Sequence, residues 1–179
     1  MINELLRLYF VQTGLGWAVA GAMFAVMFGG VGSAKGIRIA ASQAAGVLSE
    51  RPELLGKLLV LIAIPGTQGF YAFICAVIIC LRSGLLGGKV VASPIVGLGM
   101  FFVGFCMGVV EWRSAIYQGE TSAAAINLVS KKPEESGRAI LLPALVETYA
   151  VLALLAAILL ILWLSNQGLT IANPMASGQ

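Results

Sequence analysis

The segment SERPELLGK at residues 49–57 recurs in altered form as SKKPEESGR at residues 130–138. Each copy places a proline and a glutamate after a short polar turn, and each interrupts a long apolar stretch. Proline at the first position of a helix and glutamate in its first turn are typical of helix starts. The two segments therefore predict two similar pairs of helices, each pair joined at one of these prolines.

The apolar runs around the two turns are long enough to cross a membrane. Residues 8–34, 58–81 and 90–110 carry no charge, and Glu147 is the only charged residue after residue 138. Each run reaches the roughly 20 residues that a helix needs to span a bilayer, and none alternates with the period of two expected of a barrel strand. We expect an all-α membrane protein with four transmembrane helices, over about residues 5–47, 53–83, 89–129 and 134–165, and a polar tail from residue 165.

Composition supports the membrane assignment. Only 11% of the 179 residues are charged, 59% are hydrophobic and histidine is absent, whereas a soluble domain carries roughly 25% charged residues. The missing histidines remove the commonest general base, and no P-loop is present, so we expect no catalytic activity in the chain itself. A net charge of +3 is too small and scattered for nucleic-acid binding. Three cysteines without metal-ligand spacing are expected to act as small apolar residues: Cys75, Cys80 and Cys106.

Positive charge gathers around the two proline turns, at Lys35, Arg38, Arg51, Lys57, Lys131, Lys132 and Arg138. The opposite ends of the helices have only Arg7, Arg82 and Lys89. By the positive-inside rule, the Pro52 and Pro133 loops are cytoplasmic and both termini extracytoplasmic in a multi-pass cell-membrane protein.

The two halves of the chain repeat with a constant offset of 81 residues. Ser33 then matches Ser114, Pro52 matches Pro133, and Thr67 matches Thr148. A duplicated hairpin is the simplest account. We expect a first hairpin over residues 1–84 and a second, in the same orientation, over residues 85–179.

Glu147 stands alone deep in the fourth predicted helix, roughly 20 Å from the Pro133 turn at 1.5 Å per residue. Placing an acidic side chain there costs about 2.5–3.5 kcal/mol. Such a carboxylate carries an ion, or it is a structural pair or a protonated packing residue. The matching position in the first half is Gly66, so the chain has one such carboxylate per four helices.

The second predicted helix contains a polar segment, PGTQGFY, at residues 65–71. Its proline lacks an N–H and leaves the carbonyl of Leu61 without its helical partner. Spacing of i, i+3, i+4 and i+7 places four residues on one helix face: Ile64, Thr67, Gln68 and Tyr71.

Gln118 in the third predicted helix lies at nearly the depth of Glu147. A hydroxyl, two amide oxygens, a carboxylate and a backbone carbonyl at this depth form an oxygen cage suited to a monovalent hard cation. The alternative is that these polar groups only hydrogen-bond helix to helix. Spacing alone leaves both interpretations open.

Four segments in order resemble the rotor-ring proteolipid of V-type ATPases, the four-helix subunit K or c-type protein: GSAKG at 32–36, PGTQG at 65–69, KKPE at 131–134 and VETY at 146–149. The resemblance runs from about residue 14 to residue 165. It implies a homo-oligomeric ring that turns against a stator subunit bearing an arginine, with a central stalk at the cytoplasmic loops. It also implies that ATP is hydrolysed or made in a separate soluble headpiece.

The resemblance is strongest to sodium-pumping bacterial members. It implies that Na⁺ is bound by the side chains of Glu147, Gln68, Thr67 and Gln118 and by the backbone carbonyl of Ile64, and that Tyr71 closes the site with a hydrogen bond to the carboxylate. A proton-carrying ring needs only the carboxyl, so the retained amides favour Na⁺. A proton rotor of the same architecture and a stand-alone transporter or channel are the alternatives, and no organic cofactor is expected.

One segment, EWR at residues 111–113, departs from the family pattern. Charges at i and i+2 do not face each other on a helix, so Glu111 and Arg113 do not form a local pair. We expect them in the ring interior or between neighbouring subunits, with contact to lipid head groups or a second polar site as the alternatives.

Glycines are concentrated in the first and third predicted helices. Small residues let helices approach closely in lipid. We therefore expect these two helices to form the inner wall of the ring, and the second and fourth to carry the ion site on the outer side.

Overall fold

The structure, a computed structural model, describes residues 2–88 and 92–172, with the backbone alone for residues 167–172. Within these ranges all regular structure is helical, as the sequence predicts. The four longest elements are α2 (Leu15–Glu50), α4 (Thr67–Arg82), α5 (Pro94–Lys131) and α7 (Leu141–Ala172). The shorter ones are α1 (Ile2–Arg7), the π-helical turn η1 (Leu8–Gln12), α3 (Leu55–Ala63), α6 (Ser136–Ala139) and the 3₁₀ turns η2 (Pro52–Leu54), η3 (Ile64–Gly66) and η4 (Pro133–Glu135).

Four stretches of the described chain are long and apolar enough to cross a membrane: Leu15–Glu50, Pro52–Arg82, Pro94–Lys131 and Pro133–Asn166. The four predicted transmembrane helices are thus confirmed in number and order. Each proline turn also begins as predicted, because Pro52 and Pro133 are the first residues of η2 and η4.

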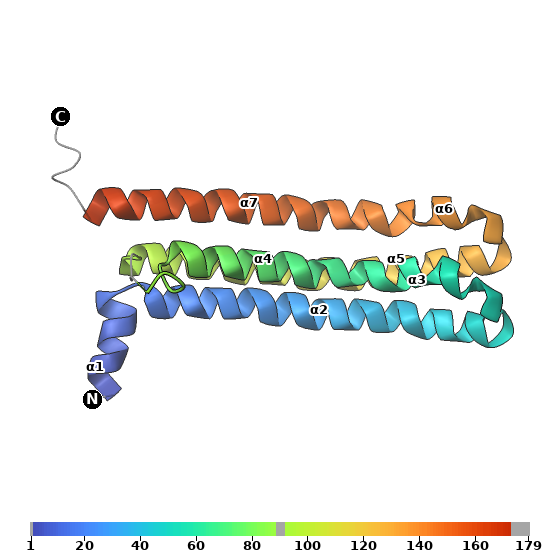
Figure 1. The fold of residues 1–179 in the computed structure, drawn as a ribbon, viewed down its shortest axis with the longest axis horizontal. Coiled ribbons are helices and arrows are strands. Elements are labelled where there is room, and N and C mark those ends of the chain that lie inside the picture. The colour runs from blue at the N-terminus through green and yellow to red at the C-terminus, as the bar shows by residue number, and fades with distance from the viewer. Residues whose placement is uncertain (1, 89–91, 173–179) are drawn as a thin grey trace. The chain divides into compact units, whose positions relative to one another are not determined.

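The start of the first predicted helix is wrong. The chain does not run as one helix from residue 5, because Thr13 is extended, with φ −127° and ψ 160°. The Thr13 N–H and Oγ1 both donate to the carbonyl of Leu8 at 2.9 Å, and the Gly14 N–H donates to the carbonyl of Ala92 at 2.8 Å. These bonds end η1 and let α2 begin at Leu15, so that α1 leads away from the direction of α2 (Figure 1).

The other helix ends also differ from the prediction. α7 continues to Ala172, past the predicted end at residue 165. α4 ends at Arg82 and Gly84 follows with φ 84°, a left-handed conformation that favours glycine after a helix. The predicted start of the third helix, at residues 89–91, lies outside the described residues together with Lys89, and α5 begins at Pro94.

The chain forms two compact units. Unit 1 lies within residues 1–27, 72–108 and 154–179, and unit 2 comprises residues 28–71 and 109–153. Each unit takes segments from both predicted hairpins, so the compact units do not follow the predicted boundary between residues 84 and 85.

Close approach of α2 to α5 explains why the two hairpins do not separate into units of their own. In unit 1 a Cβ on Gly21 or Gly104 would overlap the backbone of the other helix, and in unit 2 the same is true of Gly36 and Gly119. Glycine at these positions lets the two backbones touch. The expected close packing of the first and third membrane helices is confirmed within each unit.

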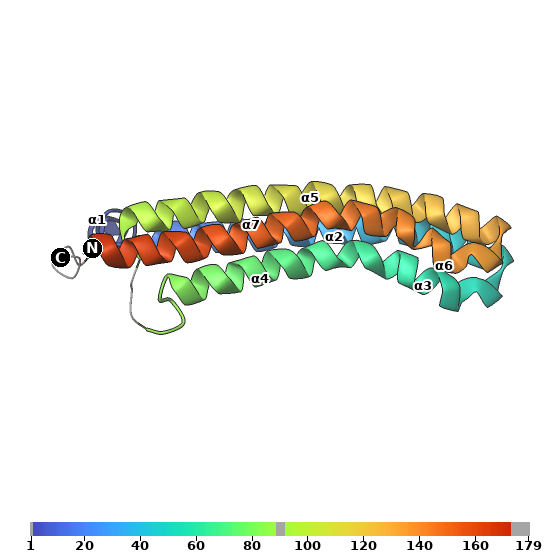
Figure 2. The same cartoon turned by 90° about the horizontal axis from the view of Figure 1, so that it is seen from above.

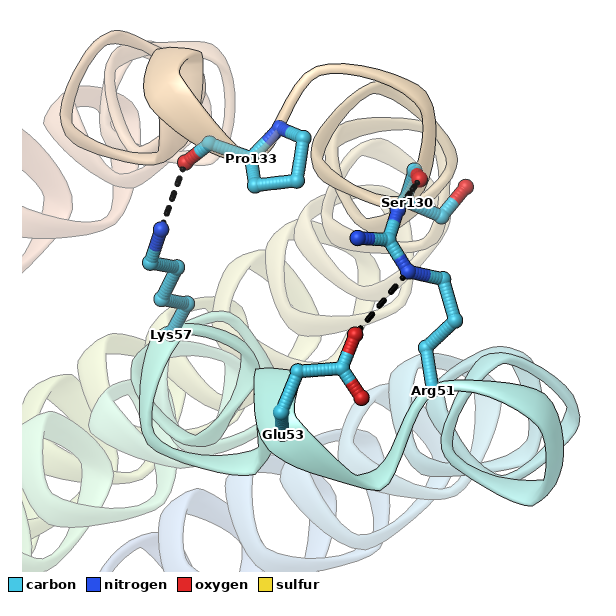
Figure 3. A network of polar contacts seen from close by, with 5 residues as sticks. All are labelled: Arg51, Glu53, Lys57, Ser130 and Pro133. Atoms are coloured by element: carbon cyan, nitrogen blue, oxygen red, sulfur yellow. Dashed lines mark hydrogen bonds and ion pairs between the residues drawn. The ribbon is translucent and has the colours of Figure 1, made fainter.

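In unit 2 the two proline turns lie next to each other at the same end of their helices (Figures 1 and 2). Arg51 donates from Nη1 to the carbonyl of Ser130 at 2.5 Å and pairs through Nε with Glu53 at 3.1 Å (Figure 3). Lys57 donates to the carbonyl of Pro133 at 3.0 Å. Beside these contacts lies a buried apolar cluster from both hairpins: Ala40, Ala44, Leu54, Leu58, Leu61, Ala125, Ile126, Val129 and Ala139. The two turns are therefore fixed to each other.

Candidate ion-binding site

The polar segment in the second membrane helix forms an irregular turn. Pro65 separates α3 from α4, and the chain between them forms the single 3₁₀ turn η3. The carbonyl of Ile64 accepts the Thr67 N–H and also the Thr67 Oγ1, the latter at 3.0 Å. Local irregularity caused by the proline is thus confirmed, and the Ile64 carbonyl lies at its centre.

Two fully buried glutamines meet beside this turn. Gln68 from α4 donates through Nε2 to Oε1 of Gln118 from α5 at 2.6 Å. The same Nε2 lies 3.5 Å from the Oγ of Ser114. Gln118 donates in turn to the carbonyl of Pro143 in α7 at 3.0 Å. Buried amides keep most of their hydrogen bonds in this way, which avoids the cost of leaving them unsatisfied.

Glu147 of α7 is partly buried and is contacted from two other helices. The Tyr71 hydroxyl donates to its Oε1 at 2.6 Å, and Gln118 Nε2 reaches its Oε2 at 3.5 Å. In a membrane interior an acidic group is stable only when it is paired, protonated or bound to a cation. The two contacts orient the carboxyl toward α4 and α5.

Thr67 completes the connection, because its Oγ1 lies 3.4 Å from Oε1 of Gln68. The structure therefore brings all six predicted residues into one continuous network within unit 2, from Ile64 and Thr67 through the two glutamines to Glu147 and Tyr71. Their roles as ion ligands remain a prediction.

The donor set is one carboxyl among neutral oxygens. Among the described residues no group of three His, Cys, Asp or Glu side chains lies close enough to hold a metal ion. A single carboxylate balances a single positive charge, and hydroxyl, amide and carbonyl oxygens are ligands that hard cations accept. Such a set can bind a monovalent cation or, at the carboxyl alone, a proton.

Glu147 also borders the outer surface of unit 2. It lines a groove of about 440 Å³ on α7 with Ala144, Thr148, Val151 and Leu152. Around it, apolar side chains face outward, and Leu145 is 67% exposed. The carboxyl therefore lies at the boundary between a polar network inside the chain and an apolar outer face.

Sequence reasoning missed three contributors to the network. Ser33 of α2 accepts from the Gly69 N–H at 2.8 Å and donates to the Gly66 carbonyl at 3.3 Å. Ser114 and the Pro143 carbonyl contact the glutamines. The repeat contained a signal for two of them, since Ser33 and Ser114 occupy matching positions and both contact the PGTQG segment. Nothing in the sequence indicated that a backbone carbonyl of α7 accepts from Gln118.

The expectation for Glu111 is wrong. Its side chain has no exposed surface even in the isolated chain, so it does not project into a ring interior or toward a neighbouring subunit. The expectation failed because Glu111 shares the face of α5 that carries Ser114 and Gln118, and this face is buried within the chain. Arg113 is exposed. Its guanidinium donates a hydrogen bond to the Tyr117 hydroxyl and lies over the face of the Tyr117 ring.

Fold and site together define a membrane protein of two tandem helical hairpins with one carboxylate in a polar network at membrane depth. Comparison with known proteins identifies its family. The sequence profile of the C subunit of ATP synthase matches twice, at residues 20–79 and 101–160, again 81 residues apart. The chain belongs to this family, and the double match confirms the tandem repeat.

Two curated relatives refine the assignment. The chain is 36% identical over 149 residues to "V-type sodium ATPase subunit K" of Enterococcus hirae, with 83% of this chain and 92% of the relative covered. It is 33% identical over 158 residues to "A-type ATP synthase subunit K" of Methanocaldococcus jannaschii, covering 88% of this chain and 69% of the relative. The chain is thus a rotor-ring proteolipid of a V- or A-type rotary ATPase, a non-catalytic membrane component, as the sequence segments predict.

Proposed function

We propose that this proteolipid carries Na⁺ across the membrane by reversible binding at Glu147, coupled to rotation of the ring. The observation that carries the proposal is the continuous network of oxygen-bearing groups from Ile64 to Glu147. A proton carrier needs only the carboxyl, whereas a cation needs the additional neutral oxygens that Thr67 and the two glutamines supply. The similarity to a protein named for a sodium ATPase supports the same ion.

The cycle follows from the position of the carboxyl. Na⁺ neutralises Glu147, and a neutral site faces lipid at lower cost than an ionised one. An arginine on a membrane stator subunit then attracts the carboxylate and favours release of the ion. Loaded sites pass through lipid and empty ones remain at the stator, so ion flow and rotation are coupled.

The assembly is part of the same proposal. Copies of the chain form a homo-oligomeric ring in which α2 and α5 face the axis, because their glycines let the two backbones approach closely. α4 and α7 then carry the site outward. The basic proline turns lie on the cytoplasmic side, where they contact the central stalk, and both termini are extracytoplasmic.

A proton rotor of the same architecture is the second candidate. One observation favours it: the two amides already hydrogen-bond each other, Gln68 to Gln118 at 2.6 Å. Their role would then be packing between α4 and α5. Sodium binding instead requires both amide oxygens to turn toward the ion, so the two functions differ in whether Na⁺ competes for the carboxyl.

The test is protection of Glu147 from a hydrophobic carbodiimide, which reacts with protonated carboxyls, in the purified ring. Sodium is expected to slow labelling of Glu147 at neutral and alkaline pH, with modification located by mass spectrometry. The variant Gln68→Leu should lose most of this protection. Gln43→Leu is the matched control, because Gln43 hydrogen-bonds Asn127 away from the site. A labelling rate that depends on pH but not on the sodium concentration would establish the proton rotor instead.

Transport supplies a second readout. Glu147→Gln removes the charge that holds the ion while keeping a similar shape. In the assembled ATPase this variant is expected to abolish sodium transport and the ATP hydrolysis coupled to it. Transport that survives the substitution would exclude Glu147 as the carrier.

A further inference from the structure

Glu111 is a second acidic residue in the membrane interior, outside the network described above. Its side chain is fully buried, and neither carboxyl oxygen has a hydrogen-bond partner. It lies on α5, seven residues and therefore two turns from Gln118, on the same helix face. Along the helix this separation is about 10 Å.

An ionised Glu111 would be unusually unfavourable here. A buried charge is stable only with a paired opposite charge or several hydrogen bonds. Among the described residues the Glu111 carboxyl has neither. Arg113, two residues away, points elsewhere, since its guanidinium contacts the hydroxyl and ring of Tyr117. The neutral acid form avoids the charge entirely.

The titratable groups on the neighbouring helices provide no positive charge that could balance an ionised Glu111. The titratable groups of the network on α7 and α4 are Glu147 and Tyr71, which hydrogen-bond each other. Both can only be neutral or negative. On α2 the residues from 15 to 34 carry no titratable side chain. None of these groups supplies a positive charge that would stabilise an ionised Glu111.

A bound metal cation is a poorer explanation than a proton. A cation such as Na⁺ needs several oxygen ligands, and within the described part of the chain no group hydrogen-bonds the Glu111 carboxyl. Ser114, one turn along the same face, has its hydroxyl directed at Gln68. A proton needs only the carboxyl itself.

From this burial and isolation we infer that Glu111 is a second, permanently occupied proton-binding site of the protein, distinct from the ion carrier. Glu147 borders the outer groove and can exchange its ion, whereas Glu111 has no exposed surface through which a proton could leave at a stator. Each copy of the chain thus holds two intramembrane carboxyls, of which one turns over and the other stays neutral. The inference rests on the proposed function only in assigning the exchanging ion to Glu147.

Infrared spectroscopy of the purified ring in lipid vesicles tests this directly, through the C=O stretching band of a protonated carboxylic acid. The contribution of Glu111 is obtained as the difference between the spectra of the wild-type ring and of the Glu111→Gln ring. With saturating Na⁺ present, the cation takes the place of a proton at Glu147 in the proposed function, and the remaining band is expected to come from Glu111. It should persist in Glu147→Gln and be lost completely in Glu111→Gln.

Glu111→Met, of similar length and without a carboxyl, serves as a second variant if the first does not assemble. No acid band in sodium-loaded wild-type ring, or a band whose intensity is unchanged by removal of Glu111, would overturn the inference. A band in Glu147→Gln that disappears on adding Na⁺ would overturn it in favour of a second cation site. A band component in sodium that is lost in Glu147→Gln would refute sodium coupling and leave the assignment of Glu111 intact.

Discussion

The hydroxyl of Tyr71 donates a 2.6 Å hydrogen bond to Oε1 of Glu147, while Gln118 approaches the other carboxyl oxygen at 3.5 Å. The two oxygens of one carboxyl are thus differently engaged, one held tightly by α4 and one loosely by α5. In the proposed function, this asymmetry leaves Oε2 as the oxygen available to Na⁺. Tyr71 is therefore the group that holds the Glu147 carboxyl in position beside the other residues of the network.

Replacing Tyr71 by Phe is expected to weaken sodium binding about 10-fold or more. A hydrogen bond to a charged group contributes about 1.5–3 kcal/mol, and each 1.4 kcal/mol corresponds to about tenfold in affinity. Without the phenol the carboxylate swings toward the groove on α7. The measurement is the Na⁺ concentration that gives half-maximal protection of Glu147 from carbodiimide.

Tyr149→Phe is the matched control for this experiment. Tyr149 lies on the same helix as Glu147 but is 72% exposed on the outer face. Its substitution should leave sodium protection within about twofold of the wild type, because surface changes have small effects. Equal effects of the two substitutions would show that Tyr71 does not act through its hydrogen bond.

The residues of the candidate site were largely predictable from the sequence, but the groups that hydrogen-bond and position them were not. Helical spacing placed Ile64, Thr67, Gln68 and Tyr71 on one face and depth placed Gln118 near Glu147, while the family resemblance supplied the carbonyl of Ile64 as a ligand. Which backbone atom receives the Gln118 amide depends on how α7 rotates against α5, and one-dimensional spacing does not determine that. The Pro143 carbonyl was missed for this reason, whereas Ser33 was missed although the repeat matches it to Ser114.

The fold was also predictable only in part. Charge-free runs predicted the number and order of the membrane helices, since a span needs length and apolarity. They did not predict the break at Thr13, because the bond from Gly14 to the Ala92 carbonyl joins residues far apart in sequence. Glu111 was expected in the ring interior or between neighbouring subunits, although its spacing from Gln118 already put both on one face.

Gln118→Leu is expected to impair the site more than any other single amide change. Gln118 accepts from Gln68 and donates toward both Pro143 and Glu147. Its loss removes a proposed ligand and leaves the buried Gln68 amide without its closest partner, at a cost of about 1–3 kcal/mol. Sodium affinity should fall about 10-fold or more in the protection assay, together with a lower thermal stability of the ring. Unchanged sodium affinity alongside lower stability would assign Gln118 to packing alone.

Gly36→Ala is expected to destabilise the protein, because a Cβ there would overlap the backbone carbonyl of Ala115 on α5. Overpacking costs about 1–3 kcal/mol, and backbone atoms cannot turn aside as a flexible side chain can. The measurement is the temperature at which the purified ring dissociates. Gly30→Ala is the control, since nothing lies within 4 Å of a Cβ at that position, and it should be neutral or slightly stabilising. Equal losses in both variants would contradict close α2–α5 packing as the cause.

Single cysteines introduced at Ser49 and at Ile2, in a variant whose native cysteines are replaced, test the orientation. Ser49 is exposed in the last turn of α2, at the proline-turn end, and Ile2 is exposed in α1, at the N-terminal segment. The basic cluster around the turns predicts that a membrane-impermeant thiol reagent labels the Ser49→Cys variant only from the cytoplasmic side and the Ile2→Cys variant only from the outside. The reverse pattern would place the basic turns against the positive-inside rule and remove the proposed contact with the central stalk.

Acidification is expected to raise the sodium concentration needed to protect Glu147. Protons and Na⁺ compete for the same carboxyl in the proposed function, and only the ionised carboxylate binds the cation, so more Na⁺ is required as the proton concentration rises. The half-protecting sodium concentration should therefore increase steadily as pH is lowered and level off at alkaline pH, where proton competition ends. Tyr71→Phe should shift this curve to higher sodium without changing its direction. A half-protecting concentration that does not depend on pH would mean that sodium binds somewhere other than the Glu147 carboxyl.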